Sequence, residues 1–314
     1  MEAPSAPRGL ILDLITPLNE DGSVDGRGLG RLIDRTAGQV QGILISGPRG
    51  GEGTWLGPEK RLDLLDKTLV VVRGQIPLLV WITGETEDDT TELLVGLRRR
   101  IERRKYTGRV FWVDTPLYYH SNRGLPALYG EFCSKVREPF LLHNDPELIK
   151  GLAKPFKRSN IRTAILKEMT TLKSLAGMVF NGSIDRARNY HRASRRRPGF
   201  RIYDGSEAHF LEHPSMSGVV SLGANLAPGA WQMITRSALQ LYHDREDSPY
   251  TQQRIWEIGG YLLGLRDAYA EAPVPAVKEA LCAAGIIETP FTFYEQEGER
   301  VKQDILDLMA RYEK

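Results

Sequence analysis

Lys167 is the residue of this sequence whose setting most clearly predicts chemistry. It follows Thr163–Leu166, a short and mostly apolar run with the composition of a buried strand. A lysine in an apolar pocket has a lowered pKa, because burial disfavours the charged form of the amine. The neutral amine can attack a carbonyl carbon and form a Schiff base, which is the chemistry of class I aldolases. A strand-end lysine that pairs with a carboxylate is the structural alternative.

A glycine-rich loop is the second feature whose composition predicts binding. It reads Gly47-Pro48-Arg49-Gly50-Gly51 and offers backbone N–H groups to an anion. Arg49 adds a charged donor for the same purpose. No Gly-Lys-Ser/Thr follows, so the loop is not a nucleotide-binding P-loop. The alternative is a tight turn that needs glycine for its backbone angles.

His209 and His213 are spaced to share one face of a helix, as a pair of metal ligands would. The glutamate between them does not sit where a His-Glu-x-x-His site requires it, and no third ligand is evident. We therefore interpret the pair as two surface histidines, with a metal pair as the alternative.

Eight short apolar runs alternate with stretches of helical spacing, such as Glu59–Val72. This alternation predicts buried parallel strands that are covered by helices. A doubly wound sheet is the alternative, but no Gly-x-Gly-x-x-Gly follows the first run. The predicted strands are Leu10–Ile15, Ile43–Ser46, Pro77–Thr83, Val110–Asp114, Phe140–Asn144, Thr163–Lys167, Arg201–Asp204 and Val219–Leu222.

The number and length of these units predict a (β/α)8 barrel over residues 1–243. The rest, residues 244–314, is predicted to be a helical extension with helices at Ile255–Leu265, Val274–Ala284 and Arg300–Tyr312. Barrel active sites lie at the carboxyl ends of the strands. The candidate site therefore draws on the polar residues there, including Thr16, Ser46, Thr83, Asp114, His143, Asn144, Asp204, Glu207, Ser221 and Asn225.

The composition of the 314 residues is that of an ordinary soluble protein, with 41% hydrophobic and 26% charged residues. A net charge of +2 argues against a protein that binds nucleic acid through its overall charge. The arginine clusters at 98–100 and 195–197 are expected to be solvated helix surfaces, with an anion patch as the alternative. Two distant cysteines, with neither a membrane-spanning run nor a signal peptide, predict a cytoplasmic protein.

Several segments, in family order, resemble the dihydrodipicolinate synthase / N-acetylneuraminate lyase superfamily of pyruvate-dependent class I aldolases. The resemblance covers nearly the whole chain. Its segments are Leu14–Leu18 with Asp21–Asp25, Gly42–Gly47 with Gly51-Glu52, Asp114–Pro116 with Tyr118-Tyr119, Ile165–Glu168, Asp204-Gly205 with Ser217–Ser221 and Asn225, and Pro273–Lys278.

The resemblance implies a (β/α)8 fold and a Schiff base between Lys167 and pyruvate or a pyruvate-derived 2-oxo acid, which joins or releases an aldehyde. It also implies a proton relay through Tyr119, or through Tyr118 if the match shifts by one residue. The loop Gly47, Arg49, Gly50 and Gly51 would hold the carboxylate, and the backbones of Gly205 and Val220 would line the pocket. The family needs no metal and no cofactor, and a homo-oligomer, either a dimer or a tetramer, is expected.

The sequence departs from the family pattern in three places. His143 stands where the family has an acid/base tyrosine, so that this function is either altered or lost. The glycine-rich loop lacks the usual hydroxyl residues. The stretch between His143 and Lys167 is about four residues short, with Glu147 near the place of an expected basic residue. Three hypotheses stay open: an aldolase with another substrate, dihydrodipicolinate synthase itself, and a barrel that binds a ligand without turnover.

Overall fold

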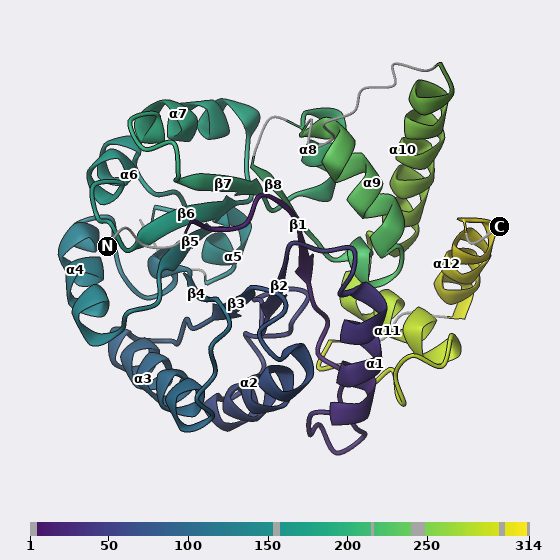
Figure 1. Ribbon diagram of the computed structural model, residues 1–314, viewed down its shortest axis with the longest axis horizontal. Helices are drawn as coiled ribbons and strands as arrows, with labels where there is room; N and C mark the ends of the chain where they lie inside the picture. Colours follow the sequence, from purple (N-terminus) through teal and green to yellow (C-terminus); the bar gives the residue numbers. More distant parts are fainter. Residues whose placement is uncertain (1–4, 153–157, 215–216, 240–248, 295–298, 313–314) are drawn as a thin grey trace.

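Eight parallel strands follow one another around a closed barrel in the computed structural model, and β8 pairs with β1 to close it (Figure 1). This confirms the predicted (β/α)8 fold. The structure describes residues 5–152, 158–214, 217–239, 249–294 and 299–312. The strands are β1 (Gly9–Asp13), β2 (Gly42–Ile45), β3 (Leu78–Trp81), β4 (Val110–Asp114), β5 (Phe140–Asn144), β6 (Leu175–Phe180), β7 (Arg201–Asp204) and β8 (Gly218–Ser221).

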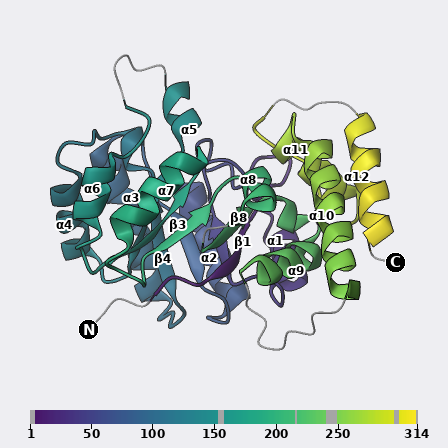
Figure 2. The same cartoon turned by 90° about the horizontal axis from the view of Figure 1, so that it is seen from above.

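Helices surround the barrel and continue into a group on one side (Figures 1 and 2). The surrounding elements are α1 (Gly26–Thr36), α2 (Pro58–Val72), α3 (Glu87–Arg103), η1 (Pro116–Tyr118), α4 (Leu125–Lys135), α5 (Pro146–Gly151), α6 (Thr163–Met169), α7 (Ile184–Ser194), α8 (Glu207–Glu212), η2 (Gly223–Asn225) and α9 (Pro228–Ala238). The side group, α10 (Pro249–Tyr269), α11 (Pro273–Ala283) and α12 (Glu299–Tyr312), confirms the expected C-terminal helices. The division at residue 243 falls outside the described residues and stays a prediction.

Among the described residues no helix is both long and apolar enough to cross a membrane.

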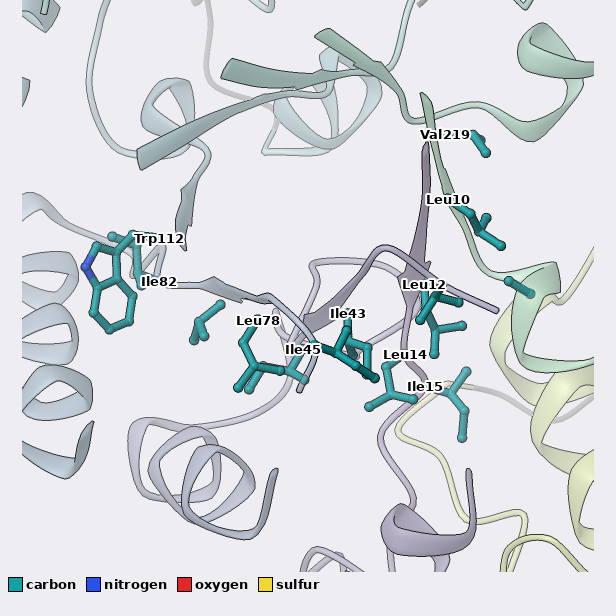
Figure 3. Close-up of a cluster of buried hydrophobic side chains, with 14 of the residues drawn as sticks. Leu10, Leu12, Leu14, Ile15, Ile43, Ile45, Leu78, Ile82, Trp112 and Val219 are labelled. Atoms are coloured by element: carbon teal, nitrogen blue, oxygen red, sulfur yellow. The ribbon is translucent and has the colours of Figure 1, made fainter. Parts of the chain in front are cut away.

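Side chains of alternate parity along the strands form two separate apolar layers. Leu10 and Leu12 of β1 belong to the layer between strands and helices, with Ile43, Ile45 and Leu78 from neighbouring strands (Figure 3). Ile11 of β1 points the other way, into a smaller cluster that fills the barrel, with Leu44, Leu79, Phe111, Leu141, Val179 and Val220. Both faces of each strand are therefore buried, which is why the strands read as continuous apolar runs.

The predicted sixth strand is wrong. Thr163–Lys167 belongs to helix α6, and β6 lies further along the chain at Leu175–Phe180. A four-residue apolar run does not distinguish a strand from a helix segment. In α6 the buried residues Leu166 and Met169 are spaced by one helical turn, whereas every residue of β6 is buried. The apparent shortening between His143 and the sixth strand came from this misplacement.

Candidate active site

Asp13, at the end of β1, brings a carboxylate into the mouth of the barrel. Side chains two residues apart on a strand share a face, and Ile11 lies in the barrel interior, so Asp13 points inward as well. Asn225 anchors this strand end: its Nδ2 donates to the Asp13 carbonyl at 2.8 Å, and its Oδ1 accepts from the Ile15 amide at 3.3 Å. The sequence pattern points to Asn225 but not to Asp13.

The Asp13 carboxylate is poorly satisfied for a buried anion. Its Oδ2 accepts one hydrogen bond, from the Gly50 amide at 3.2 Å, and its buried Oδ1 has no partner among the described residues. Burial, the largest effect, and the charge of Glu207 raise the pKa of Asp13 to about 7, against the opposing effects of the Gly50 amide and Arg49. A carboxylic acid with this pKa can both give and take a proton near neutral pH.

The loop after β2 wraps around this carboxylate. A Cβ atom on Gly47 would lie 2.5 Å from Asp13 Oδ1, and one on Gly50 would lie 2.6 Å from Oδ2. Gly51 packs as closely, since its Cβ would lie 2.3 Å from the Gly47 nitrogen. The glycines are therefore needed for close approach, and the space they leave holds a carboxylate of the same chain. That this loop binds a substrate carboxylate stays a prediction.

Glu52 fixes the far end of the loop to the C-terminal helices. Its carboxylate, which is buried, pairs with Lys278 of α11 and accepts from Thr292 Oγ1 at 2.6 Å and from the Phe293 amide at 2.9 Å. Glu52 adopts a positive φ of 54°, a strained conformation for a residue other than glycine. The fully satisfied carboxylate offsets that strain, so α11 helps to position the loop beside Asp13.

Arg49 forms the positive part of the site. Its Nε and Nη2 bond the two carboxylate oxygens of Asp145 at 2.6 and 3.0 Å, in the bidentate geometry that holds a guanidinium rigidly. Asp145 also accepts from Asn181 Nδ2 at 2.9 Å. Hydrogen bonding and charge pairing raise the pKa of Arg49 despite the opposing effect of burial. Arg49 therefore remains a fixed cation close enough to lower the pKa of Asp13.

Glu207, the first residue of α8, is a second carboxylate on the same side of the barrel. Its Oε1 accepts from Ser221 Oγ at 2.5 Å and from the Gly223 amide at 2.7 Å, and its Oε2 accepts from Tyr269 of α10 at 2.5 Å. Burial raises its pKa, and these donors lower it. Glu207 is therefore held in place by three donors, in contrast to Asp13.

A pocket of about 600 Å³ opens onto these groups, a size suited to a small ligand. Asp13, Arg49, Gly50 and Glu207 line it together with α10, α11 and the segment between them. The predicted residues Gly205 and Val220 also line it, whereas Gly47 and Gly51 do not. Its remaining wall is largely apolar or aromatic and includes Leu222, Tyr269, Pro273, Val274, Pro275 and Tyr294.

His143 lies on the other side of the barrel mouth and is not part of the lining of this pocket. Its Nδ1 lies 2.9 Å from Thr115 Oγ1, and Trp81 Nε1 donates to that same oxygen at 2.9 Å. Burial lowers the pKa of His143 to about 4, more than the neighbouring Asp145 raises it. The imidazole is therefore neutral near pH 7, and its predicted function as an acid/base stays a prediction.

The Tyr119 side chain lies in the layer between the barrel strands and the helices. Its hydroxyl donates to Asp114 Oδ2 at 2.7 Å, beside the hydroxyl of Tyr129, which donates to the same oxygen at 2.7 Å. Burial and the Asp114 charge raise the pKa of Tyr119 well above its ordinary value. These contacts describe a buried structural phenol, and the expected proton relay through Tyr119 stays a prediction.

Lys167 is not placed where its predicted chemistry requires. It lies exposed in the last turn of α6, outside the barrel, because its segment is a helix and not the sixth strand. On β6 the residue that pairs with His143 and with Tyr203 is Val179, whose side chain lies in the barrel interior. Among the described residues no lysine lines the pocket, and no group of three or more His, Cys, Asp or Glu side chains is placed to hold a metal ion.

Comparisons with known proteins assign the fold and the family. The chain is 28% identical over 288 residues to the 4-hydroxy-tetrahydrodipicolinate synthase of Aromatoleum aromaticum, covering 90% of this chain and 89% of the relative. It is 29% identical over 287 residues to the enzyme of that name from Azoarcus sp., covering 89% of each.

Solved structures show the same fold at lower identity. A prophage protein of the dihydrodipicolinic acid synthase family from E. coli K12, in complex with pyruvate, superposes with a TM-score of 0.79 at 19% identity over 98% of both chains. The dihydrodipicolinate synthase of Aquifex aeolicus gives 0.77 at 20% identity, also over 98% of both chains. The sequence profile of the dihydrodipicolinate synthetase family matches residues 6–293. The chain therefore belongs to the dihydrodipicolinate synthetase family, a family of enzymes that act as lyases and aldolases through a lysine Schiff base.

Proposed function

We propose that the pocket at the mouth of the barrel binds a small carbonyl compound and that Asp13 is the acid/base group of a lyase or aldolase reaction there. The observation that carries the proposal is the Asp13 carboxyl group itself. It lines the pocket, its buried Oδ1 has no partner among the described residues, and its pKa of about 7 suits proton transfer at neutral pH.

In the proposed reaction Asp13 takes a proton from the substrate and later returns it. The ionised carboxylate takes a proton from the carbon next to the substrate carbonyl, and the C–H electron pair forms an enolate. The enolate carbon attacks the carbonyl carbon of an aldehyde, and the new C–C bond leaves a negative oxygen that takes the proton back from Asp13. The reverse sequence cleaves the bond. Arg49, a cation held by Asp145, stabilises the enolate charge.

The expected Schiff base with pyruvate is an alternative that the family supports and the pocket does not. The relatives named above are 4-hydroxy-tetrahydrodipicolinate synthases, and the family uses a lysine. Here Lys167 is exposed on α6, and Val179 occupies the inner wall of β6. The Asp13 mechanism needs no amine, and so it accounts for the residues that line this pocket.

Hydrogen exchange in deuterium oxide tests the proposal without knowledge of the aldehyde. Proton NMR follows the loss of the hydrogens next to the carbonyl of pyruvate and of hydroxyacetone, with and without a panel of aldehydes that includes aspartate semialdehyde. We expect exchange by the wild type with at least one of the two ketones. Asp13→Asn is expected to lower that exchange by about 100-fold or more. Undiminished exchange in Asp13→Asn would refute the function of Asp13.

Borohydride trapping separates this mechanism from the Schiff base. The protein is incubated with pyruvate and sodium borohydride beside a Lys167→Ala control, and its intact mass is measured. We expect no reduced pyruvyl adduct on either protein. An adduct that disappears in Lys167→Ala would establish the imine at Lys167 and overturn the proposal.

A barrel that binds a ligand without turnover is the second candidate, and Val179 at the inner wall of β6 favours it. It predicts that ketones raise the melting temperature although neither exchange nor bond formation occurs. Exchange that depends on Asp13 excludes this candidate.

We also propose a cytoplasmic homo-oligomer, a dimer or a tetramer, on the strength of the family resemblance. Light scattering coupled to size-exclusion chromatography measures the assembly directly. A mass of 35.3 kDa at micromolar concentration would contradict it.

A further inference from the structure

The pocket already contains a carboxylate at the place where the loop offers its amide. Gly50 N–H donates to Asp13 Oδ2 at 3.2 Å, and Gly47 and Gly50 leave the space that the two carboxylate oxygens fill. An external carboxylate at this position would face the charge of Asp13 at close range, an unfavourable contact between like charges. The loop is therefore built around an internal anion.

The arginines of the pocket are engaged with carboxylates outside the lining. Arg49 bonds both oxygens of Asp145, and Arg266 bonds Asp267 through Nε at 3.2 Å and Nη2 at 2.7 Å. The lining contains these two arginines against Asp13, Glu207 and Glu271. The described charges of the pocket wall thus give an anionic ligand no unpaired cation.

We propose, on the basis of the function proposed above, that the substrate is a neutral hydroxylated carbonyl compound whose hydroxyl group donates to the Asp13 carboxylate, and that it carries no carboxylate at that end. The Asp13 carboxylate lines the pocket and accepts a single hydrogen bond, from the Gly50 amide, so it favours a ligand that donates hydrogen bonds. The apolar wall formed by Val220, Leu222, Pro273 and Pro275 suits the C–H faces of a short hydroxylated chain. The substrate class is thus that of a small sugar rather than a 2-oxo acid.

Hydroxyacetone and pyruvate form a matched pair that tests this inference, because they differ only in a hydroxymethyl group in place of a carboxylate. Ligand-observed NMR titrations at pH 8 and pH 6 give the dissociation constants. At pH 8 we expect hydroxyacetone to bind the wild type about 10-fold more tightly than pyruvate, or better. The reason is that the carboxylate of pyruvate would face the negative charge of Asp13. At pH 6 the preference is expected to shrink, because a protonated Asp13 can donate to a carboxylate. Glu207 of α8 and Arg49 of the loop are the charged groups that face Asp13 in this range.

Two variants complete the test. Asp13→Asn removes the charge and is expected to bring the ratio of the two dissociation constants near one, whereas Lys167→Ala is expected to leave the ratio unchanged. Tighter binding of pyruvate by the wild type at pH 8 would overturn the inference, as would binding of neither ligand at millimolar concentration or a ratio that Asp13→Asn does not alter. The exchange assay is a separate readout. Exchange that depends on Asp13 together with a preference for pyruvate would refute the substrate class and leave the proposed function standing.

Discussion

Asp13 and Asp114 are the last residues of two five-residue strands, β1 and β4, and burial raises the pKa of both. They differ in the face of the strand on which the side chain lies. Asp13 shares the inward face of β1 with Ile11, whereas Asp114 shares the outward face of β4 with Trp112. One carboxylate therefore reaches the pocket, and the other lies in the shell between the barrel and its helices.

Their hydrogen bonds differ accordingly. Asp114 accepts from the hydroxyls of Thr83, Tyr119 and Tyr129, each at 2.7 Å. Asp13 accepts one long bond from a backbone amide and keeps an unpartnered oxygen. A buried carboxylate with several donors is a structural group, and removing it strands its partners. A buried carboxylate that lacks donors costs stability, and a pocket beside it indicates a function. The number of donors thus separates two residues that burial alone does not.

The largest expected effect on stability belongs to Asp114. Asp114→Ala leaves three buried hydroxyls without their acceptor and is expected to lower the free energy of unfolding by about 3–5 kcal/mol. Asp13→Asn is expected to leave it unchanged or raise it at pH 8, because the change removes a poorly satisfied buried charge. Urea unfolding followed by circular dichroism measures both. Similar losses in the two variants would contradict the assignment of Asp114 as a structural group and Asp13 as a functional one.

Tyr129→Phe sharpens the same comparison. It removes one of the three donors to Asp114 and keeps the ring, whose packing against Phe132 and Phe140 is unaffected. We expect a loss of about 1–2 kcal/mol in the free energy of unfolding. A loss as large as that of Asp114→Ala would mean that the three hydrogen bonds do not contribute separately.

The dependence of stability on pH gives the next effect. Asp13 binds a proton in the folded state up to about pH 7, whereas its ordinary value is 3.8. Between these values the folded state holds a proton that the unfolded state has lost, so the contribution of Asp13 to stability falls as pH rises. The slope is at most about 1.4 kcal/mol per pH unit. Asp13→Asn should therefore gain stability relative to the wild type from pH 4 to pH 7 and no more above it.

His143 is expected to act with the opposite sign. Its pKa falls from 6.5 to about 4, so the unfolded state binds the extra proton in this range and the contribution of His143 to stability rises with pH. His143→Gln should lose stability relative to the wild type from pH 4 to pH 6.5. Urea unfolding at several pH values tests both slopes, and parallel curves for wild type and variants would contradict the assigned burial of these groups.

The sequence predicts the barrel because each buried strand is an apolar run between helical segments, and all the strands except the sixth lie where they are expected. The same apolar runs do not show which strand residues form the site. The sequence of a strand that is apolar on both faces does not show which residues point into the barrel. Asp13 and Asp114 therefore look alike in sequence, although they point to opposite sides. At the sixth strand the lysine motif favours a strand at Thr163–Lys167, although Leu166 and Met169 have helical spacing. Asp13 belongs to no family motif, and only its position relative to Ile11 and the Gly47–Gly51 loop reveals it.

The smallest expected effect belongs to Lys167, the residue that the sequence favoured most. Its side chain is exposed in the last turn of α6, whereas Asp13 lines the pocket. Replacing an exposed side chain away from caps and networks changes stability by about 0.5 kcal/mol or less. Lys167→Ala should therefore match the wild type in urea unfolding and in the exchange assay. A 10-fold loss of exchange with unchanged stability would place Lys167 in the reaction and remove the contrast between a buried acid that acts and an exposed lysine that does not.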